Sequence, residues 1–323
     1  MNNLRKIGLS ALAGSLAAFS VNAAEVSVSG GASISFDDPN RGGGEANGTR
    51  GNGFYMGDSL KFNMSGETDN GIGVAVYYEI DGGALDDYDM TLSGDWGSLK
   101  FAGSGGSSAF GAVDDVTPNA YEEAWDIVDD DGTATTGSPT VINGGGGGNM
   151  FIYTSPTMSG ATLTAAYRNN GGSTSVSESY SDFAIAMSPE AVEGLTVGVA
   201  KSDNQAGVGI DTDETTMYVK YAVGAFTIGV QQSDYDHTTA NSDQDSTAYG
   251  ITYAVNDDIS VGYSNHEVDF ESASLDNQDS RGIQASYTMG GMTLAGAMNK
   301  TDNIAGTATR DTEGYEFTLS FAF

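Results

Sequence analysis

The chain has 323 residues, no cysteine, and 44 acidic against 12 basic side chains, which gives a formal net charge of −32. This acidic balance argues against binding to nucleic acid, or to anionic lipid headgroups through a basic patch. The lack of cysteine excludes disulfides, thiol catalysis and thiolate metal sites, so the fold must depend on burial and backbone hydrogen bonds.

The first 23 residues have the pattern of a secretory signal peptide. Arg5 and Lys6 form a short basic region, an apolar and small-residue stretch runs to Val21, and small residues precede Ala23. The apolar stretch is too short to anchor the chain in a bilayer. An N-terminal core helix is disfavoured because an acidic, strand-like sequence begins at Glu25. We expect cleavage after Ala23, which leaves residues 24–323 as one domain.

Alternation of apolar and polar residues dominates the remaining sequence. Val26, Val28 and Ile34, for example, share one face of their segment, and serines occupy the positions between them. The same period of two returns in later segments, among them those around Phe62, Val76, Leu163, Ile185, Val197, Val219, Ile228, Ile251, Val261 and Ile283. A period of two is typical of a β-strand with one apolar and one polar face. The sequence therefore predicts an all-β protein.

Long and short connections alternate between these segments. The seven short ones are rich in Gly and Asn, which supply the positive φ of tight turns. They lie at residues 69–71, 95–97, 156–160, 189–194, 223–224, 256–257 and 289–291. The eight long ones are acidic and lie at residues 37–57, 81–87, 104–148, 169–179, 203–211, 234–245, 269–278 and 301–310. These connections predict 16 antiparallel strands with every long loop at one end.

A closed barrel of about 16 strands is too wide for its own side chains to fill. Its polar face must then line water, and its apolar face must meet hydrocarbon. The last strand supports this inversion, because Tyr315, Phe317, Leu319, Phe321 and Phe323 occupy every second position up to the final residue. Such a strand favours aggregation in water but is stable at a lipid interface. We therefore predict a transmembrane antiparallel β-barrel of 16 strands.

At this point the chain resembles the general porins of Gram-negative outer membranes. The matching features are the mature start at residues 24–30, the aromatic last strand, the 16-strand reading and the long third loop. The resemblance implies a channel for passive diffusion of small hydrophilic solutes and ions, a homotrimer, and contact with outer-membrane lipid and lipopolysaccharide. It also implies insertion by the barrel assembly machinery, which reads Phe321 and Phe323.

The third long loop, residues 104–148, is the main candidate for a functional site. In the family that the chain resembles, this loop folds into the lumen and narrows it. Here it contains no Lys or Arg, and residues 120–128 could form a short helix. Its acidic side chains are Asp114, Asp115, Glu122, Glu123, Asp126, Asp129, Asp130 and Asp131. We expect an acidic constriction and a preference for cations; the alternative is a solvated outer loop.

Four basic residues, Lys61, Lys100, Arg168 and Lys220, fall on the polar phase of their strands. If that phase lines the lumen, they are candidates for a basic wall opposite the loop. Solvated or interfacial positions are the alternative for each.

Other functions fit less well. His237 and His266 are the only histidines, and no serine is marked as a nucleophile beside them, so we expect no enzyme. A substrate-specific outer-membrane channel and a soluble secreted acidic β-protein remain as alternatives. No cofactor is required. Acidic clusters at residues 129–131 and 211–214 could hold Ca²⁺ through oxygen ligands, although neither has the spacing of a dedicated calcium loop.

Overall fold

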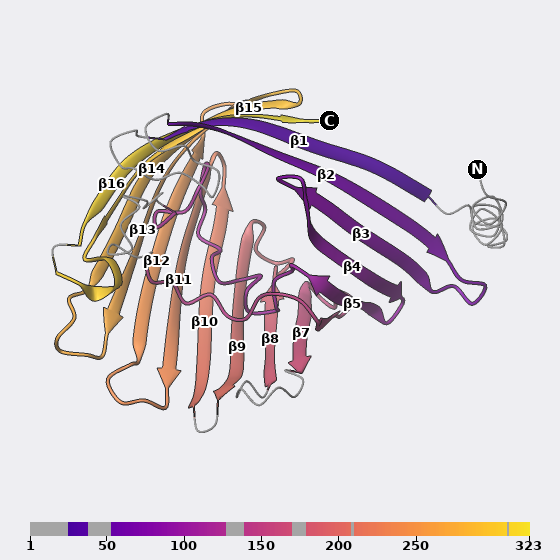
Figure 1. Ribbon diagram of the computed structural model, residues 1–323, viewed down its shortest axis with the longest axis horizontal. Helices are drawn as coiled ribbons and strands as arrows, with labels where there is room; N and C mark the ends of the chain where they lie inside the picture. Colours follow the sequence, from indigo (N-terminus) through magenta and orange to yellow (C-terminus); the bar gives the residue numbers. More distant parts are fainter. Residues whose placement is uncertain (1–24, 38–52, 127–138, 170–178, 208–209, 309) are drawn as a thin grey trace, which may run out of the picture.

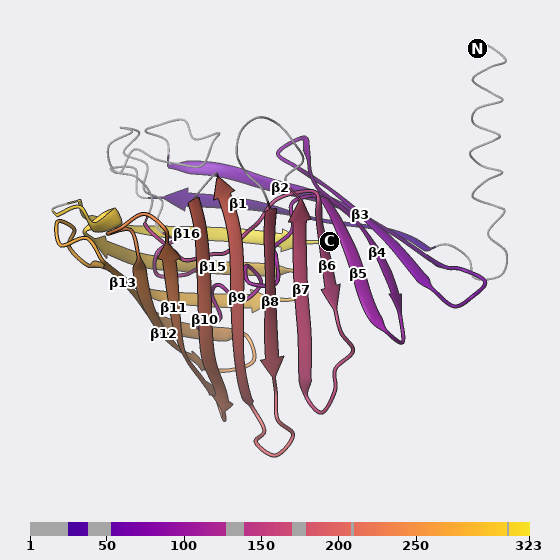
Figure 2. The same cartoon turned by 90° about the horizontal axis from the view of Figure 1, so that it is seen from below.

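The computed structural model describes residues 25–37, 53–126, 139–169, 179–207, 210–308 and 310–323. Sixteen antiparallel strands form one closed barrel (Figures 1 and 2). The strands are β1 (Glu25–Asp37), β2 (Phe54–Glu67), β3 (Gly73–Asp81), β4 (Ala84–Gly94), β5 (Gly97–Ser104), β6 (Met150–Thr154), β7 (Ala161–Asn169), β8 (Ser179–Met187), β9 (Leu195–Gly207), β10 (Ile210–Val223), β11 (Phe226–His237), β12 (Gln244–Ala254), β13 (Ile259–Phe270), β14 (Gln278–Met289), β15 (Met292–Asp302) and β16 (Thr312–Ala322). A 3₁₀ turn, η2 (Ile304–Gly306), precedes β16.

Each strand pairs with its neighbours in sequence, and β1 pairs with β16 to close the barrel. The last residue takes part in this closure: Gly30 N donates to Phe323 O at 2.7 Å, and Phe323 N donates to Gly30 O at 3.0 Å. Closure leaves no unpaired strand edge, which is what a sheet in hydrocarbon requires. The prediction of a 16-strand antiparallel barrel is confirmed.

The two faces of the barrel have opposite polarity, and the apolar face points outward. On β11, Ile228 and Val230 are 44% and 55% exposed, whereas Gln231 and Ser233 are each 3% exposed. The other strands follow the same rule, with Val, Ile, Met and Phe side chains on the exposed face. A water-soluble barrel would place these side chains inside. The inversion predicted from the sequence is therefore present.

Two connections that we predicted to be long are short. β3 ends at Asp81 and β4 begins at Ala84, with Gly82 and Gly83 both at positive φ between them. Likewise β9 runs to Gly207 and β10 begins at Ile210. The acidic residues assigned to loops continue the strand ladders instead. Strand pairing does not need apolar side chains, so a strand can extend past the membrane with a polar surface.

The third loop lies within the ring of strands (Figures 1 and 2) and is described over residues 105–126 and 139–149. The predicted helix at residues 120–128 is absent over residues 120–126; the last two positions lie outside the described residues. The backbone groups there bond to the barrel wall instead. Ala120 N donates to Gln284 Oε1 at 2.8 Å, and Asn299 Nδ2 donates to the carbonyls of Glu123 and Asp126, both at 3.1 Å. In a helix over these residues, the Glu123 carbonyl would instead accept a bond from the backbone four residues further on.

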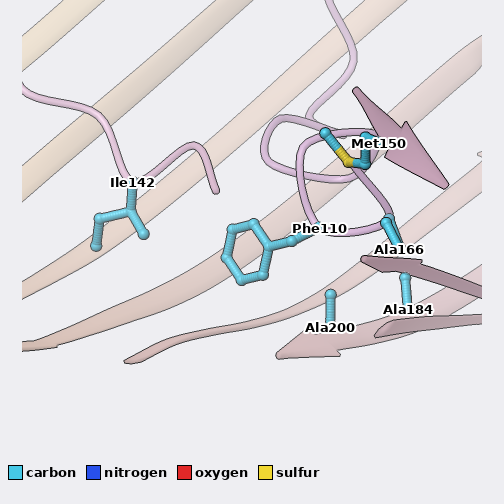
Figure 3. Packing of buried hydrophobic residues seen from close by; sticks show 7 residues of the cluster. Phe110, Ile142, Met150, Ala166, Ala184 and Ala200 are labelled. Atoms are coloured by element: carbon cyan, nitrogen blue, oxygen red, sulfur yellow. The ribbon is translucent and has the colours of Figure 1, made fainter. Parts of the chain in front are cut away.

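Among the described residues, a small apolar core lies in the lumen where the third loop meets the wall. Phe110, fully buried, lies between Ile142 of the returning loop and the alanines of β7, β8 and β9 (Figure 3). The members of the cluster are Ala109, Phe110, Ile142, Met150, Ala166, Ala184 and Ala200. Burial of this cluster fixes one end of the loop against the barrel.

In the part of the chain that the structure describes, no helix is long and apolar enough to cross a membrane. Residues 1–24 lie outside the described residues, so the predicted signal peptide and cleavage site stay predictions.

Candidate channel constriction

The loop root, residues 108–111 and 144–146, is tied to β7 and β8 by buried polar groups. Asp182 Oδ1 accepts the backbone N–H of Ala109 at 3.2 Å, and Oδ2 accepts that of Phe110 at 2.7 Å. Tyr180 Oη donates to Asp182 Oδ2 at 2.8 Å and accepts the N–H of Gly145, also at 2.8 Å. The outgoing and returning arms of the loop are thus held at one place on the wall.

Beyond the root, inward-facing amide side chains hold the loop along the wall. Gln231 accepts Val116 N at 2.9 Å and donates to the carbonyls of Val113 and Asp114, both at 2.8 Å. Gln278 similarly accepts Thr140 N at 2.8 Å and donates to Thr140 O at 3.0 Å. An amide can donate and accept at once, which suits it to a backbone peptide group. The loop therefore follows the inner face of β8 to β16.

The acidic segment, residues 114–126, contains five of the eight predicted acidic residues. Asp114, Asp115, Glu122 and Glu123 are partly buried, and Asp126 is exposed. Burial raises the pKa of Asp114 to about 6, and burial together with the nearby carboxylate of Glu316 raises that of Glu122 to about 8. Burial is also the main cause of the raised pKa of Asp115 and Glu123. Asp129, Asp130 and Asp131 lie outside the described residues.

At its far end, the acidic segment contacts the closing strands of the barrel. Tyr121 Oη donates to Glu316 Oε1 and lies 2.7 Å from Thr318 Oγ1. Thr318 in turn donates to Glu316 at 2.8 Å and lies 2.7 Å from Ser35 Oγ of β1. Burial and the bond to Glu316 both raise the pKa of Tyr121, so its hydroxyl stays protonated as a donor.

A cavity of about 240 Å³ separates the two arms of the loop. Asp114, Asp115 and Glu123 line it on one side, with Trp125, and Ile142 and Asn143 of the returning arm also border it. Three carboxyl groups thus face one small space without a Lys or Arg among the residues that line it. The ionised carboxylates make the electrostatic potential in that space negative.

The predicted basic residues of β2 and β5 face the lumen, but each has an acidic partner. Lys61 Nζ lies 3.3 Å from Glu79 Oε1, and Lys100 Nζ lies 3.4 Å from Asp89 Oδ2. The partners are on the adjacent strands β3 and β4, so the pairs form within the wall. No ion pair joins either lysine to the described part of the third loop. This wall therefore carries little uncompensated positive charge.

Arg168 and Lys220 have different surroundings. The Arg168 guanidinium donates to Gly146 O of the loop root and lies over the Tyr180 ring, 5.6 Å from its centroid. It is thus part of the loop attachment rather than of an open basic wall. Lys220 is half-buried on the inner face of β10, in register with Gly229 and Thr196.

His237 and His266 have hydrogen-bonded or buried surroundings, and the acidic cluster at residues 211–214 points to both faces of its strand, while the cluster at residues 129–131 lies outside the described residues. His237 Nδ1 accepts the N–H of Thr239 at 2.8 Å, and His266 is buried against Trp125 with ring centroids 4.4 Å apart. The alternation of β10 turns Asp213 outward and Glu214 inward toward Ser202. Among the described residues, no group of three His, Asp or Glu side chains could hold a metal ion.

The sequence expectations missed the wall residues that position the loop. None of Asp182, Gln231, Gln278, Gln284 and Asn299 is among the predicted site residues, and Gln278 falls within the long connection predicted at residues 269–278. One signal was available: they are large hydrogen-bonding side chains on a phase otherwise rich in Ser, Thr, Gly and Ala. In a wide solvated bore, such side chains have no packing role, so their presence suggests a partner in the lumen.

Comparisons with solved structures agree with this architecture. The anion-selective porin from Comamonas acidovorans superimposes with a TM-score of 0.69 at 14% identity, covering 93% of this chain and all of that one. OmpT from the outer membrane of Vibrio cholerae gives a TM-score of 0.67 at 11% identity, covering 94% and 99%. A mutant of the Rh. blastica porin gives 0.58 at 16% identity, covering 93% and 100%. At these identities the likeness shows the fold.

Sequence comparison supplies the family. No curated protein sequence matches the chain. Residues 8–276 match the Gram-negative porin family, which is most of the chain and includes the third loop and the wall of β1 to β13. The chain therefore belongs to the Gram-negative porins, and it is a channel of the outer membrane rather than an enzyme.

Proposed function

We propose that the protein is a general diffusion porin that prefers cations, with the third loop as its acidic constriction. One observation carries the proposal: the loop brings carboxyl groups into the lumen and contains no Lys or Arg, whereas Lys61 and Lys100 of the wall are paired with acidic residues of adjacent strands. A bore with net negative charge concentrates cations and excludes anions. The fold is shared with a porin described as anion-selective, so the fold alone does not determine which ions are preferred. The proposal therefore depends on the charges that line the bore.

In this proposal the acids at positions 114, 115, 123, 126 and 129–131 give the lumen its negative charge, and Glu122, whose pKa is raised to about 8, adds to that charge as it ionises toward pH 8. Lys61 and Lys100, with Glu79 and Asp89, contribute local dipoles and little net charge. Arg168 attaches the loop, and Lys220 lines the bore elsewhere. Solutes without charge pass by size alone.

We propose further that three copies assemble, as the family typically does, and that the last strand serves as the assembly signal. Phe321 and Phe323 are 42% and 76% exposed on the outward face, and the backbone of Phe323 pairs with Gly30. An exposed aromatic pair at the closing seam is accessible to a partner before the barrel closes. Three equal closure steps in a planar bilayer would support a trimer, and a single step would contradict it.

The reversal potential in a salt gradient tests the selectivity. A cation-directed potential that shrinks at high salt is expected, because salt screens the lining charges. Asp114→Asn combined with Glu123→Gln should reduce it, whereas Asp95→Asn, in the turn between β4 and β5, should not. An anion-directed potential of the unaltered protein would contradict the acidic constriction and leave the porin fold unaffected.

A further inference from the structure

Asp182 of β8 and Glu316 of β16 are the two buried acidic residues of the described lumen wall, and Asp182 is the one at the loop root. The Asp182 side chain is only 6% exposed, and no Lys or Arg among the described residues is paired with it. Burying a carboxylate is costly unless hydrogen bonds replace its water. Asp182 must therefore obtain its stabilisation from the groups around it.

Four donors from three segments satisfy the Asp182 carboxylate. Oδ1 accepts Ala109 N at 3.2 Å and Ala166 N of β7 at 3.1 Å, and Oδ2 accepts Phe110 N at 2.7 Å and Tyr180 Oη at 2.8 Å. Bonds to an ionised acceptor are among the stronger hydrogen bonds in proteins. An asparagine could not replace it, because its NH₂ group would face donors.

The same place also holds the returning arm of the loop. Ser108 N donates to Gly145 O at 3.2 Å, and Gly145 packs so closely on Tyr180 that an added Cβ would lie 2.5 Å from the ring. Tyr180 links the two arms, because its hydroxyl contacts Ser108 Oγ, Gly145 N and Asp182. Asp182 is thus the only charged acceptor among the described contacts that tie the outgoing arm at the root.

We propose that Asp182 is the positioning residue of the third loop: it fixes the point on β8 from which the loop runs along the inner face of the barrel. The consequence for transport rests on the proposed function, in which the loop narrows the bore. Once the root is released, the acidic segment keeps only its contacts with β11 to β16, and its distance from the opposite wall fluctuates. Asp182 contacts no solute; it acts through the loop.

The absence of cysteine provides a direct test. In an Ala109→Cys variant, the single thiol sits at a position that is 1% exposed and should be protected from a small, water-soluble methanethiosulfonate. Adding Asp182→Asn or Asp182→Ala should raise its reaction rate by more than about tenfold, since charge-assisted bonds are lost. Tyr180→Phe, which keeps the ring against Gly145, should give a smaller increase.

Asp203→Asn is the matched control. It removes the same charge from the neighbouring strand β9, where Asp203 is exposed. Heat-modifiable migration on gels confirms that each variant has a folded barrel. A thiol at position 109 that reacts no faster in either Asp182 variant than in the control would overturn the proposal.

Single-channel recordings separate this proposal from the proposed function. With a faster thiol reaction we also expect noisier open-channel current and an altered conductance. If the thiol reaction accelerates while conductance and noise match the unaltered protein, Asp182 still positions the loop. That result would instead contradict the proposed function, in which the loop is the constriction of the channel.

Discussion

At the loop root a carboxylate meets N–H and O–H donors, whereas in the acidic segment carboxyl groups meet other carboxyl groups. Asp182 has four hydrogen-bond donors around it and a buried apolar cluster beside it. Glu122 lies near Glu316, and the main bond that holds this end is a neutral tyrosine hydroxyl on Glu316. The root should therefore be stable over a wide range of conditions, and the acidic segment should respond to pH and salt.

The largest effect is expected at the root. Phe110→Ala removes a fully buried ring from the cluster in Figure 3 and leaves a cavity. Loss of such a side chain typically costs about 3–5 kcal/mol. Amide hydrogen exchange over residues 108–113 should accelerate by two orders of magnitude or more, on the order of that free energy. Phe110→Leu is the control and should retain most of the protection; equal exchange in both variants would argue against a packed root.

A smaller effect is expected where the acidic segment meets β16. Tyr121→Phe keeps the ring and removes the donor to Glu316, which leaves that carboxylate with fewer partners. Loss of a hydrogen bond to a charged group costs about 1.5–3 kcal/mol. Exchange should rise for residues 119–126 and stay unchanged at the root. Tyr235→Phe, on the inner face of β11, tests whether loss of any lumen hydroxyl has the same result.

The third prediction concerns pH. We call the loop seated when its acidic segment contacts β16. Glu122 has a pKa raised from 4.5 to about 8 in the seated loop, so it keeps its proton up to a higher pH there than in a released loop. Seating is therefore strongest below about pH 4.5, weakens as the pH rises toward 8, and changes no further above that. Open-channel noise should increase severalfold across this window.

Glu122→Gln should remove the part of that dependence near pH 8, because the amide stays neutral next to Glu316, while Asp114, with a pKa raised to about 6, keeps a part at lower pH. Asp95→Asn, in an exposed turn at the other end of the barrel, should leave it intact. A pH profile that is the same in Glu122→Gln and in the unaltered protein would mean that another group controls the segment.

The barrel could be predicted from the sequence because period-two alternation is a property of single strands. Val26 and Val28 face lipid whatever their neighbours do, and the final aromatic strand needs no knowledge of tertiary contacts. The path of the loop could not be predicted in this way. It depends on pairs such as Asp182 with Ala109 and Gln284 with Ala120, which lie 73 and 164 residues apart. The strands that end at Asp81 and Gly207 differ from the prediction because acidic residues favour a loop by composition, whereas here they continue the strand pairing.

The smallest effect is expected on the wall that the described loop does not contact. Lys61→Gln breaks one ion pair on the lumen wall, in which the Lys61 side chain is 42% exposed and that of Glu79 13%. Ion pairs in contact with water contribute about 0–1 kcal/mol to stability. The measurable result of Lys61→Gln is in selectivity: Glu79 loses its cationic partner and keeps the hydrogen bond from Tyr77, the bore gains one negative charge, and the reversal potential should shift slightly further toward cations. The double variant Lys61→Gln with Glu79→Gln should return it to the original value, because the pair carried no net charge. If Lys61→Gln alone instead produced a large shift of the reversal potential, Lys61 would be acting as an unpaired positive charge that faces the loop. The contrast between a charged loop and a balanced wall would then be wrong.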